Sequence, residues 1–345
     1  MYKRQLLYIL ASLFIISSCS DDDNNENLVQ GFQVINLVGK AIGTTKMVPD
    51  IDGDGQDDLG NCFDLTIEDP YSGEIIGTGT DCLSNVTQVG DGLAIVGTAF
   101  FDFNDGSSVI TRGLTSVRPK SHGSPDITHI TGAIPISSSN DILSGTGQFE
   151  GARGGVRLSG AVNMSKVQSD NEITFNCLFV LPAMIDPSNS DPNKMVLRLV
   201  GTDEGEMRSV GDIDGDGVDD MGNCFDLDLI DVRTGEVIGT ATDCLSNVNT
   251  AGEGLALTGT AIFNLPQGQI ITRGLTSVQP KTHGSEDKTH ITGAIPSFGD
   301  NDIVSGTGIY EGATGTSRLS GAVDMSRVQS NNEISFDCVF VLNID

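Results

Sequence analysis

Short runs of alternating apolar and polar residues, separated by turns rich in glycine and asparagine, recur along most of the chain. This period of two predicts β-strands with one buried face, and no window keeps apolar residues at helical spacing over three turns. In the first half, the pattern predicts eight strands, at residues 32–45, 62–68, 74–86, 93–103, 108–117, 128–134, 154–164 and 172–181. Eight strands with short connections can close into an antiparallel barrel, which leaves no unpaired edge, or stack as a two-sheet sandwich.

The second half of the chain repeats the first. The segment that begins at Asp50 (DIDGDG) returns at Asp212, 162 residues later, and the segment that begins at His129 (HITGAIP) returns at His290, 161 residues later. Each copy is long enough to bury its own core. Residues 183–194 contain two prolines and no periodicity, which is typical of a linker. The sequence therefore predicts an all-β protein of two tandem eight-stranded antiparallel β-barrels, at residues 28–182 and 195–345.

The first 18 residues have the pattern of a secretory signal. Lys3 and Arg4 precede an apolar run that is too short to span a bilayer, and small residues follow it. The segment Ile16-Ser-Ser-Cys19 resembles the lipobox of bacterial lipoproteins, which implies that Cys19 is lipidated and anchors the mature chain to a membrane. An acidic tether follows at residues 19–27 and resembles the signal that sends some lipoproteins to the outer face of the outer membrane. A periplasm-facing protein with a solvated spacer is the alternative.

Composition narrows the classes of function. The 345 residues include 47 Asp and Glu against 19 Lys and Arg, which gives a formal net charge of −28. Phosphate backbones would be repelled, so nucleic acid is excluded as a partner bound through a basic surface. Tryptophan is absent and 38% of the residues are hydrophobic, which is enough to build two cores.

One segment carries a resemblance to a known family. The segments SGTGQFEGARG from Ser144 and SGTGIYEGATG from Ser305 resemble the Gly-Thr-Gly-x-aromatic-x-x-Ala-x-Gly segment of dirigent proteins, whose eight-stranded barrel allene oxide cyclases share. As in that family, the segment precedes the last two strands of each copy. The resemblance implies the barrel fold and, as one functional possibility, a cyclase or isomerase that needs no cofactor. The glycines have a steric role in any case, because they allow a positive φ at a bend.

Two acidic loops carry the most specific chemical pattern, a ladder of alternate aspartates with glycine at position 6. Alternate Asp side chains can converge on one ion, and a position 7 carbonyl adds an oxygen, as Ca²⁺ prefers. The expected ligands are Asp50, Asp52, Asp54, Gln56, Asp58 and Asn61, and Asp212, Asp214, Asp216, Val218, Asp220 and Asn223. Asn replaces the bidentate Glu of an EF-hand, and the cysteine that follows makes the loop resemble a thrombospondin type 3 repeat. We expect structural, weak calcium sites of about 10⁻⁴–10⁻³ M, against the alternative of a solvated acidic turn.

Each copy holds three cysteines besides Cys19. Two of them are symmetric about the turn of a predicted hairpin, which places them opposite each other, and a secreted protein can oxidise them. The predicted disulfides are Cys62–Cys82 and Cys224–Cys244, each beside its acidic loop. The third, Cys177 or Cys338, is in phase with the apolar residues of the last strand, so we expect it to behave as a small buried hydrophobe.

Other residues that could carry chemistry form no recognisable motif. The four histidines lack a local zinc-binding spacing, and no nucleophile elbow, Walker loop or dinucleotide fingerprint is present. If these residues point into a barrel, they could contact a ligand or act in catalysis; otherwise they are structural histidines and outward-facing charges. The weak candidates are Arg112, His129, Glu150, Arg157, Arg273, His290, Glu311 and Arg318.

Three functions fit the sequence. The first is a cell-surface lipoprotein whose calcium-stabilised barrels bind a small apolar molecule, a glycan or a partner. The second is the cofactor-independent cyclase or isomerase that the resemblance implies, and the third is a structural component of the envelope. The volume and lining of the barrel interior separate them, because a pocket of about 300 Å³ with converging polar groups favours a ligand and a packed interior favours a structural role.

Overall fold

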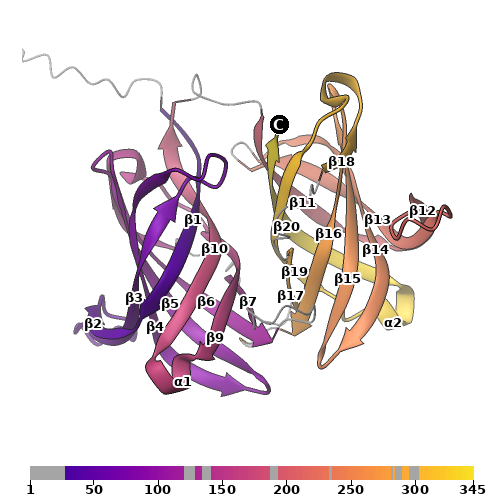
Figure 1. Ribbon diagram of the computed structural model, residues 1–345. Helices are drawn as coiled ribbons and strands as arrows, with labels where there is room; N and C mark the ends of the chain where they lie inside the picture. The colour runs from indigo at the N-terminus through magenta and orange to yellow at the C-terminus, as the bar shows by residue number, and fades with distance from the viewer. Residues whose placement is uncertain are drawn as a thin grey trace, which may run out of the picture.

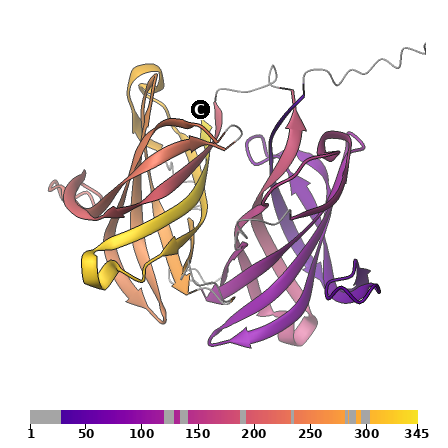
Figure 2. The ribbon, with the colours of Figure 1, turned by 180° about the vertical axis from the view of Figure 1, so that it is seen from behind.

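The computed structural model describes residues 28–119, 129–133, 141–186, 193–232, 235–280, 283, 290–294 and 303–345. It contains two all-β domains that stand side by side (Figures 1 and 2). In each domain one antiparallel sheet holds ten strands, in the order β1-β10-β9-β7-β6-β5-β4-β3-β2 with β8 on β6, and β11-β20-β19-β17-β16-β15-β14-β13-β12 with β18 on β16. The two orders are equivalent strand for strand, as the sequence repeat predicts.

The strands of the first domain are β1 Val29–Ile42, β2 Thr44–Val48, β3 Asp58–Glu68, β4 Ile75–Val89, β5 Gly92–Phe103, β6 Ser108–Pro119, β7 His129–Ala133, β8 Ile142–Thr146, β9 Arg157–Lys166 and β10 Glu172–Ile185. Those of the second are β11 Lys194–Glu204, β12 Glu206–Gly211, β13 Asp220–Asp231, β14 Val237–Ala251, β15 Gly254–Leu265, β16 Gly268–Pro280, β17 His290–Ala294, β18 Ile303–Gly306, β19 Gly315–Asp324 and β20 Glu333–Ile344. The short helices are η1 Gly147–Phe149, α1 Val167–Asp170, η3 Gly308–Tyr310 and α2 Val328–Asn331. Within the described residues, no helix has the length and apolarity needed to cross a membrane.

A short seam closes each sheet into an eight-stranded barrel. Residues 36–38 of β1 pair with residues 66–68 of β3, and residues 197–200 of β11 pair with residues 228–231 of β13. The predicted barrel is therefore confirmed, and the sandwich alternative is wrong. Beyond the seam the chain bends at Gly43, and β2 continues along the other end of β3.

The alternation of side chains divides every strand between the barrel interior, or lumen, and the outer wall. Each lumen is filled mainly by apolar side chains, including the aromatic pairs Phe63–Phe175 and Phe101–Phe179, whose ring centroids are 5.4 and 5.1 Å apart. The second lumen repeats these pairs with Phe225–Phe336 and Phe263–Phe340, at 5.3 and 5.2 Å. Edge and tilted contacts of this kind add to the stability that apolar burial provides.

All eight strands predicted in the first domain are present, and two short ones are additional. The pattern at residues 32–45 predicts one strand, whereas the structure breaks it after Ile42 and resumes at Thr44. The segment with the dirigent resemblance contains the end of β8 and the helix η1. There Gly147 has a φ of 58°, and a Cβ at this position would lie 2.7 Å from the Cβ of Ser107, so glycine is required both for conformation and for space.

The two barrels contact each other through equivalent surfaces. The hydroxyl of Ser159 donates a hydrogen bond to the carbonyl of Leu319 at 2.6 Å, and Ser320 donates to the carbonyl of Leu158 at 2.8 Å. This exchange is reciprocal, because residues 319 and 320 repeat residues 158 and 159. Apolar side chains of β1, β10 and β20 form a common cluster beside it, composed of Val34, Leu178, Val180, Val339 and Val341. The contact is therefore an approximate two-fold interface within one chain.

Charged groups of the interface depart from that symmetry. Arg118, which is 3% exposed, forms ion pairs with Asp91 of its own barrel and with Glu253 of the other, and it donates to the carbonyl of Pro280 at 3.0 Å. Its repeat equivalent is the uncharged Gln279. Ionic contacts thus reinforce the interface on one side of the two-fold axis more than on the other.

Candidate functional sites

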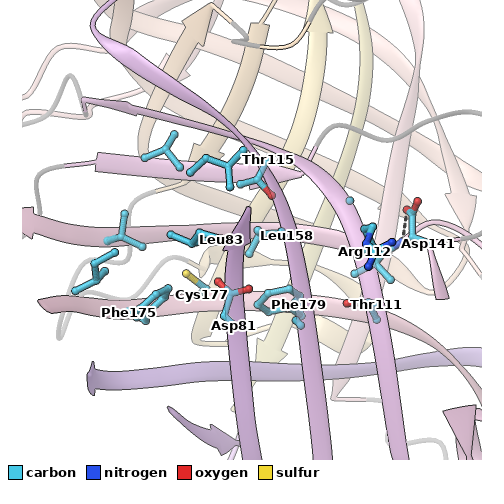
Figure 3. A pocket seen from close by; sticks show the side chains of 18 of the residues that line it. Asp81, Leu83, Thr111, Arg112, Thr115, Asp141, Leu158, Phe175, Cys177 and Phe179 are labelled. Atoms are coloured by element: carbon cyan, nitrogen blue, oxygen red, sulfur yellow. Dashed lines mark hydrogen bonds between the residues drawn. The ribbon is translucent and has the colours of Figure 1, made fainter. Parts of the chain in front are cut away.

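A small apolar cavity lies inside each barrel, and Figure 3 shows the cavity of the first. Its volume is about 50 Å³ in both barrels, which is room for a few water molecules or a compact organic group. The first cavity is lined by Leu83, Ile95, Phe175 and Phe179 among other apolar residues, together with the polar residues Asp81, Thr111, Arg112, Thr115, Asp141 and Cys177. Asp243, Thr272, Arg273, Thr276 and Cys338 line the second cavity at equivalent positions.

A pair of facing glycines creates this space. Gly97 of β5 is opposite Gly113 of β6, and both line the first cavity. A Cβ built on Gly113 would have no heavy atom within 4 Å, and the same is true of Gly274, which faces Gly259 in the second barrel. Side chains at these positions would fill the lumen, so the cavities follow from residue choice at two neighbouring strands.

One carboxyl group projects into each lumen, from Asp81 or Asp243. Asp81 lies beside Cys177 (Figure 3), and Asp243 exposes only 8% of its surface. No hydrogen bond or ion pair joins either carboxyl to any residue within the described part of the chain. Burial without a partner disfavours the charged form and raises the pKa of each carboxyl to about 7. Both carboxyl groups therefore titrate near neutral pH.

The lumen cysteines are inert thiols. Burial, and next the nearby Asp81, raise the pKa of Cys177 to about 12, and burial also raises that of Cys338. Both side chains are buried and line the cavities, as the phase of the last strand predicts. A nucleophilic cysteine needs an electropositive setting that favours the thiolate, and these lumens provide the opposite.

The acidic loops bring three carboxylates together in each domain. Ligand oxygens of Asp50, Asp52 and Asp54 all lie within 4.8 Å of one another, and the same holds for Asp212, Asp214 and Asp216. Backbone N–H groups hold them in place: Asp50 accepts from Gly53 at 2.7 Å and from Gly55 at 2.8 Å. These bonds, with that from Gly55 the strongest, lower the pKa of Asp50, so its carboxylate form is favoured. An oxygen-rich anionic cluster of this kind suits a hard divalent cation.

The remaining predicted ligands divide into two groups. Asp58 folds back across the loop, where its carboxylate accepts from the N–H of Ile51 at 2.5 Å, and Gln56 follows the ladder with its N–H bonded to Asp54. Asn61 lies apart, because it is in β3 and exchanges amide hydrogen bonds of 2.8 and 3.1 Å with Asn171. In the second domain, Asp220 accepts from Ile213 and the N–H of Val218 bonds to Asp216. There Asn223 pairs with Asn332.

Each acidic loop is fastened to the outer wall of its barrel. The guanidinium of Arg112 donates to the carbonyls of Pro49 and Asp50, at the start of the loop, and to the hydroxyl of Thr98. Arg273 does the same in the second domain, with Val210, Asp212 and Thr260. These arginines are therefore outward-facing residues with partners.

The disulfides lie beneath the same loops. Cys62–Cys82 and Cys224–Cys244 are both present, which confirms the predicted pairing. The first packs against Val48, Ile51 and Phe100 in a small apolar cluster outside the barrel. The Cα atoms are 3.9 Å apart, closer than the usual disulfide separation, because the two cysteines are directly opposed in the ladder.

The structure does not bring the other candidate residues together in a lumen. Arg157 points to the other barrel, where its Nη2 lies 3.1 Å from Oδ1 of Asp337. Arg318, its repeat equivalent, is also outside the cavity lining, and Glu150 and Glu311 are exposed to solvent. The side chains of His129 and His290 lie outside the described residues. Among the residues described, the charged residues that line the cavities are Asp81, Arg112 and Asp141 in the first barrel and Asp243 and Arg273 in the second. Of these, only Asp81 and Asp243 have no hydrogen bond or ion pair with a described residue.

The sequence pattern did not identify the lumen carboxyls or the contact that His283 makes between the domains. Asp81 and Asp243 precede the disulfide cysteines, and strand alternation places them inside once those cysteines lie outside. His283 of the second domain contacts the first: its Nε2 lies 3.1 Å from the amide nitrogen of Ile95 and 2.9 Å from the carbonyl oxygen of Thr115. The recurrence of Asp-Cys at the same point in both copies is the signal that could have identified the lumen carboxyls.

Comparison with known proteins identifies no family. No family model and no curated protein matches the chain. A solved structure named pyocyanin demethylase is similar over 44% of this chain and 99% of its own, with 17% identity and a TM-score of 0.24. A similarity this low carries no argument about activity, so the function is argued from the two kinds of site.

The lumen carboxyls make stability depend on pH. Because the pKa of Asp81 and Asp243 rises on folding from 3.8 to about 7, the folded state binds their protons more tightly, and their contribution is lost as pH rises through 7. The stability advantage of the double variant Asp81→Asn/Asp243→Asn over wild type should grow by about 2.7 kcal/mol per site from pH 5 to pH 8, because two pH units separate pH 5 from a pKa of about 7. Denaturant unfolding at both pH values measures this difference. Asp102→Asn, on the exposed face of β5, is the control, and equal pH dependence in wild type and the double variant would contradict the assignment.

Proposed function

We propose that this protein is a cell-surface lipoprotein that acts as a binding module, in which each of two calcium-stabilised barrels takes up one small apolar molecule. The observation that carries the proposal is the recurrence of one cavity, with the same apolar lining and one unpaired carboxyl, at the same place in both barrels. A buried polar group without a partner costs stability. Its presence in both copies supports a ligand-binding role over a merely structural one.

The volume of the cavities limits the size of the ligand that they can hold. At about 50 Å³ they are well below the roughly 300 Å³ of common ligand pockets. A glycan or a lipid chain therefore does not fit, and the proposed ligand is a compact molecule. Each chain would bind two such molecules, one per barrel.

The same small volume favours a second candidate, a structural role in the envelope, in which the lumens act only as cores. The alternative of a cofactor-independent cyclase or isomerase is favoured by one observation, the carboxyl with a pKa of about 7 in each lumen, because such a group can transfer a proton near neutrality. Occupancy of the lumen separates the structural role from the other two.

Calcium is proposed as a structural ion of the two acidic loops. Asp50, Asp52 and Asp54 would hold it with Asp58 and the carbonyl of Gln56, and the matching residues of the second loop are Asp212, Asp214, Asp216, Asp220 and the carbonyl of Val218. Asn61 and Asn223 are left out of the set because their amides are engaged elsewhere. The ion would neutralise the converging carboxylates and stiffen the connection between β2 and β3 against the disulfide.

The membrane anchor is proposed from the sequence, since residues 1–27 lie outside the described part of the chain. Lipidation at Cys19 would tether the protein by acyl chains, each contributing about 0.8 kcal/mol per buried CH₂. The acidic tether favours the outer face of the outer membrane. Both barrels would then be joined to the bilayer through the acidic tether.

Xenon tests whether the lumens admit a guest, because it is a small apolar atom that enters apolar cavities inside proteins. Xenon NMR should report two sites in the wild-type chain. The variants Gly113→Val and Gly274→Val place a side chain in open lumen space and should each remove one site without unfolding the protein. Xenon shifts that are identical in wild type and in the double glycine variant would refute lumen binding and leave the structural role.

Calcium titration tests the loops. Isothermal calorimetry should give two sites per chain, and 10 mM Ca²⁺ should add about 1.4–2.7 kcal/mol of stability per site at dissociation constants of 10⁻⁴–10⁻³ M. Asp52→Asn and Asp214→Asn should each remove one site. Asp57→Asn, an exposed acid of the same loop outside the carboxylate cluster, should remove none. Melting curves that coincide in EGTA and in excess calcium would count against the site.

Metabolic labelling with a palmitate analogue tests the anchor. The wild-type protein should be labelled and should sediment with membranes, whereas Cys19→Ser should be unlabelled and released. Protease accessibility on intact cells should separate surface exposure from a periplasm-facing location. A labelled Cys19→Ser variant would exclude this residue as the lipidation site.

A further inference from the structure

We propose that the molecule bound in each lumen is a small apolar amine, held as an ammonium by the carboxylate of Asp81 or Asp243. This inference rests on the proposed lumen-binding function and names the chemical class of its ligand. The amine would enter with its hydrocarbon part against the apolar lining and its nitrogen at the carboxyl. The acidic proton of the carboxyl would leave to solvent when a protonated amine binds, so charge is balanced within the pair.

The unpartnered carboxyl is the first argument. Asp243 is 92% buried, being 8% exposed, and neither it nor Asp81 has a hydrogen bond or ion pair with a described residue. Buried polar groups in native proteins are nearly always paired, and each exception calls for an explanation. A ligand that donates a charged hydrogen bond would satisfy the group and would make the strongest kind of contact available to it.

The surroundings favour a cation over other ligands. No lysine side chain lines either cavity in the described part of the chain. Arg112 and Arg273 are among the lining residues, but each directs its guanidinium outward, to backbone carbonyls at its acidic loop. Asp141, the other carboxyl at the first cavity, already accepts the N–H of Val156 at 2.9 Å. Phe175 and Phe179 line the same space, and aromatic faces attract ammonium groups. An anionic ligand would meet the lumen carboxyl, whereas the guanidinium groups of the two lining arginines are already bonded outside the lumen.

The net charge of the whole chain also favours a cationic ligand. A net charge of −28 concentrates small cations near the protein and repels small anions, which raises association rates for amines. Fatty acids and other carboxylates are disfavoured both by the negative electrostatic potential of the protein and by the carboxyl group already present in each lumen. A neutral apolar molecule gains burial but leaves Asp81 unpaired.

A matched set of two-carbon compounds, small enough for the cavities, tests the proposal on the full mature chain. Isothermal calorimetry at pH 8 should show ethylamine binding at two sites, at least tenfold more tightly than ethanol, with no binding of acetate. At pH 6, where Asp81 and Asp243 begin protonated, amine binding should weaken and should release close to one proton per site, measured in buffers of different ionisation enthalpy. Binding that is independent of pH would overturn the proposal.

Isosteric variants assign the effect to the carboxyls. Asp81→Asn and Asp243→Asn should each remove one amine site, and together both, while leaving xenon binding intact; Asp102→Asn should change nothing. Amine binding that survives in the double variant, or that is no tighter than alcohol binding, would overturn the amine assignment while xenon binding upholds the lumen site. Exclusion of xenon and of every probe would overturn both proposals together.

Discussion

Closure of the antiparallel ladder is the constraint on which the rest of this structure depends. Once β1 pairs with β3, each strand has one face inside and one outside, and neighbouring residues are separated by the thickness of the wall. Cys82 thus lies outside in a disulfide beneath the acidic loop, while Asp81 lies inside an apolar lumen. A single peptide bond connects the side of the barrel that carries the acidic loop to the interior.

Much of the fold was predictable from local pattern. Alternation located all eight barrel strands, and the symmetry of Cys62 and Cys82 about one turn predicted the disulfide correctly. The short strand β8 was missed because five residues carry too little periodicity to stand out from a turn. The start of β2 was included in the first predicted strand, because the pattern does not show the break after Ile42.

The candidate sites were only partly predictable, because they depend on contacts distant in sequence. The aspartate ladder is local and could be read directly, whereas the removal of Asn61 from the ligand set depends on Asn171, 110 residues away. The cavity depends on which glycines face each other across β5 and β6, which requires the register. The role of Arg112 as an anchor of the loop requires knowledge that residues 49 and 50 lie over its strand.

The reciprocal contact of Ser159 and Ser320 has an evolutionary consequence. A homodimer built on this surface would have to keep every interface residue compatible with its own copy, since any substitution appears on both sides. Here both copies belong to one gene product, so each can change alone: Asp337 pairs with Arg157, while its repeat counterpart is the uncharged Asn176. Because the two halves are joined in one chain, their sequences do not have to stay identical. Each can acquire a different specificity while the contact between them is kept.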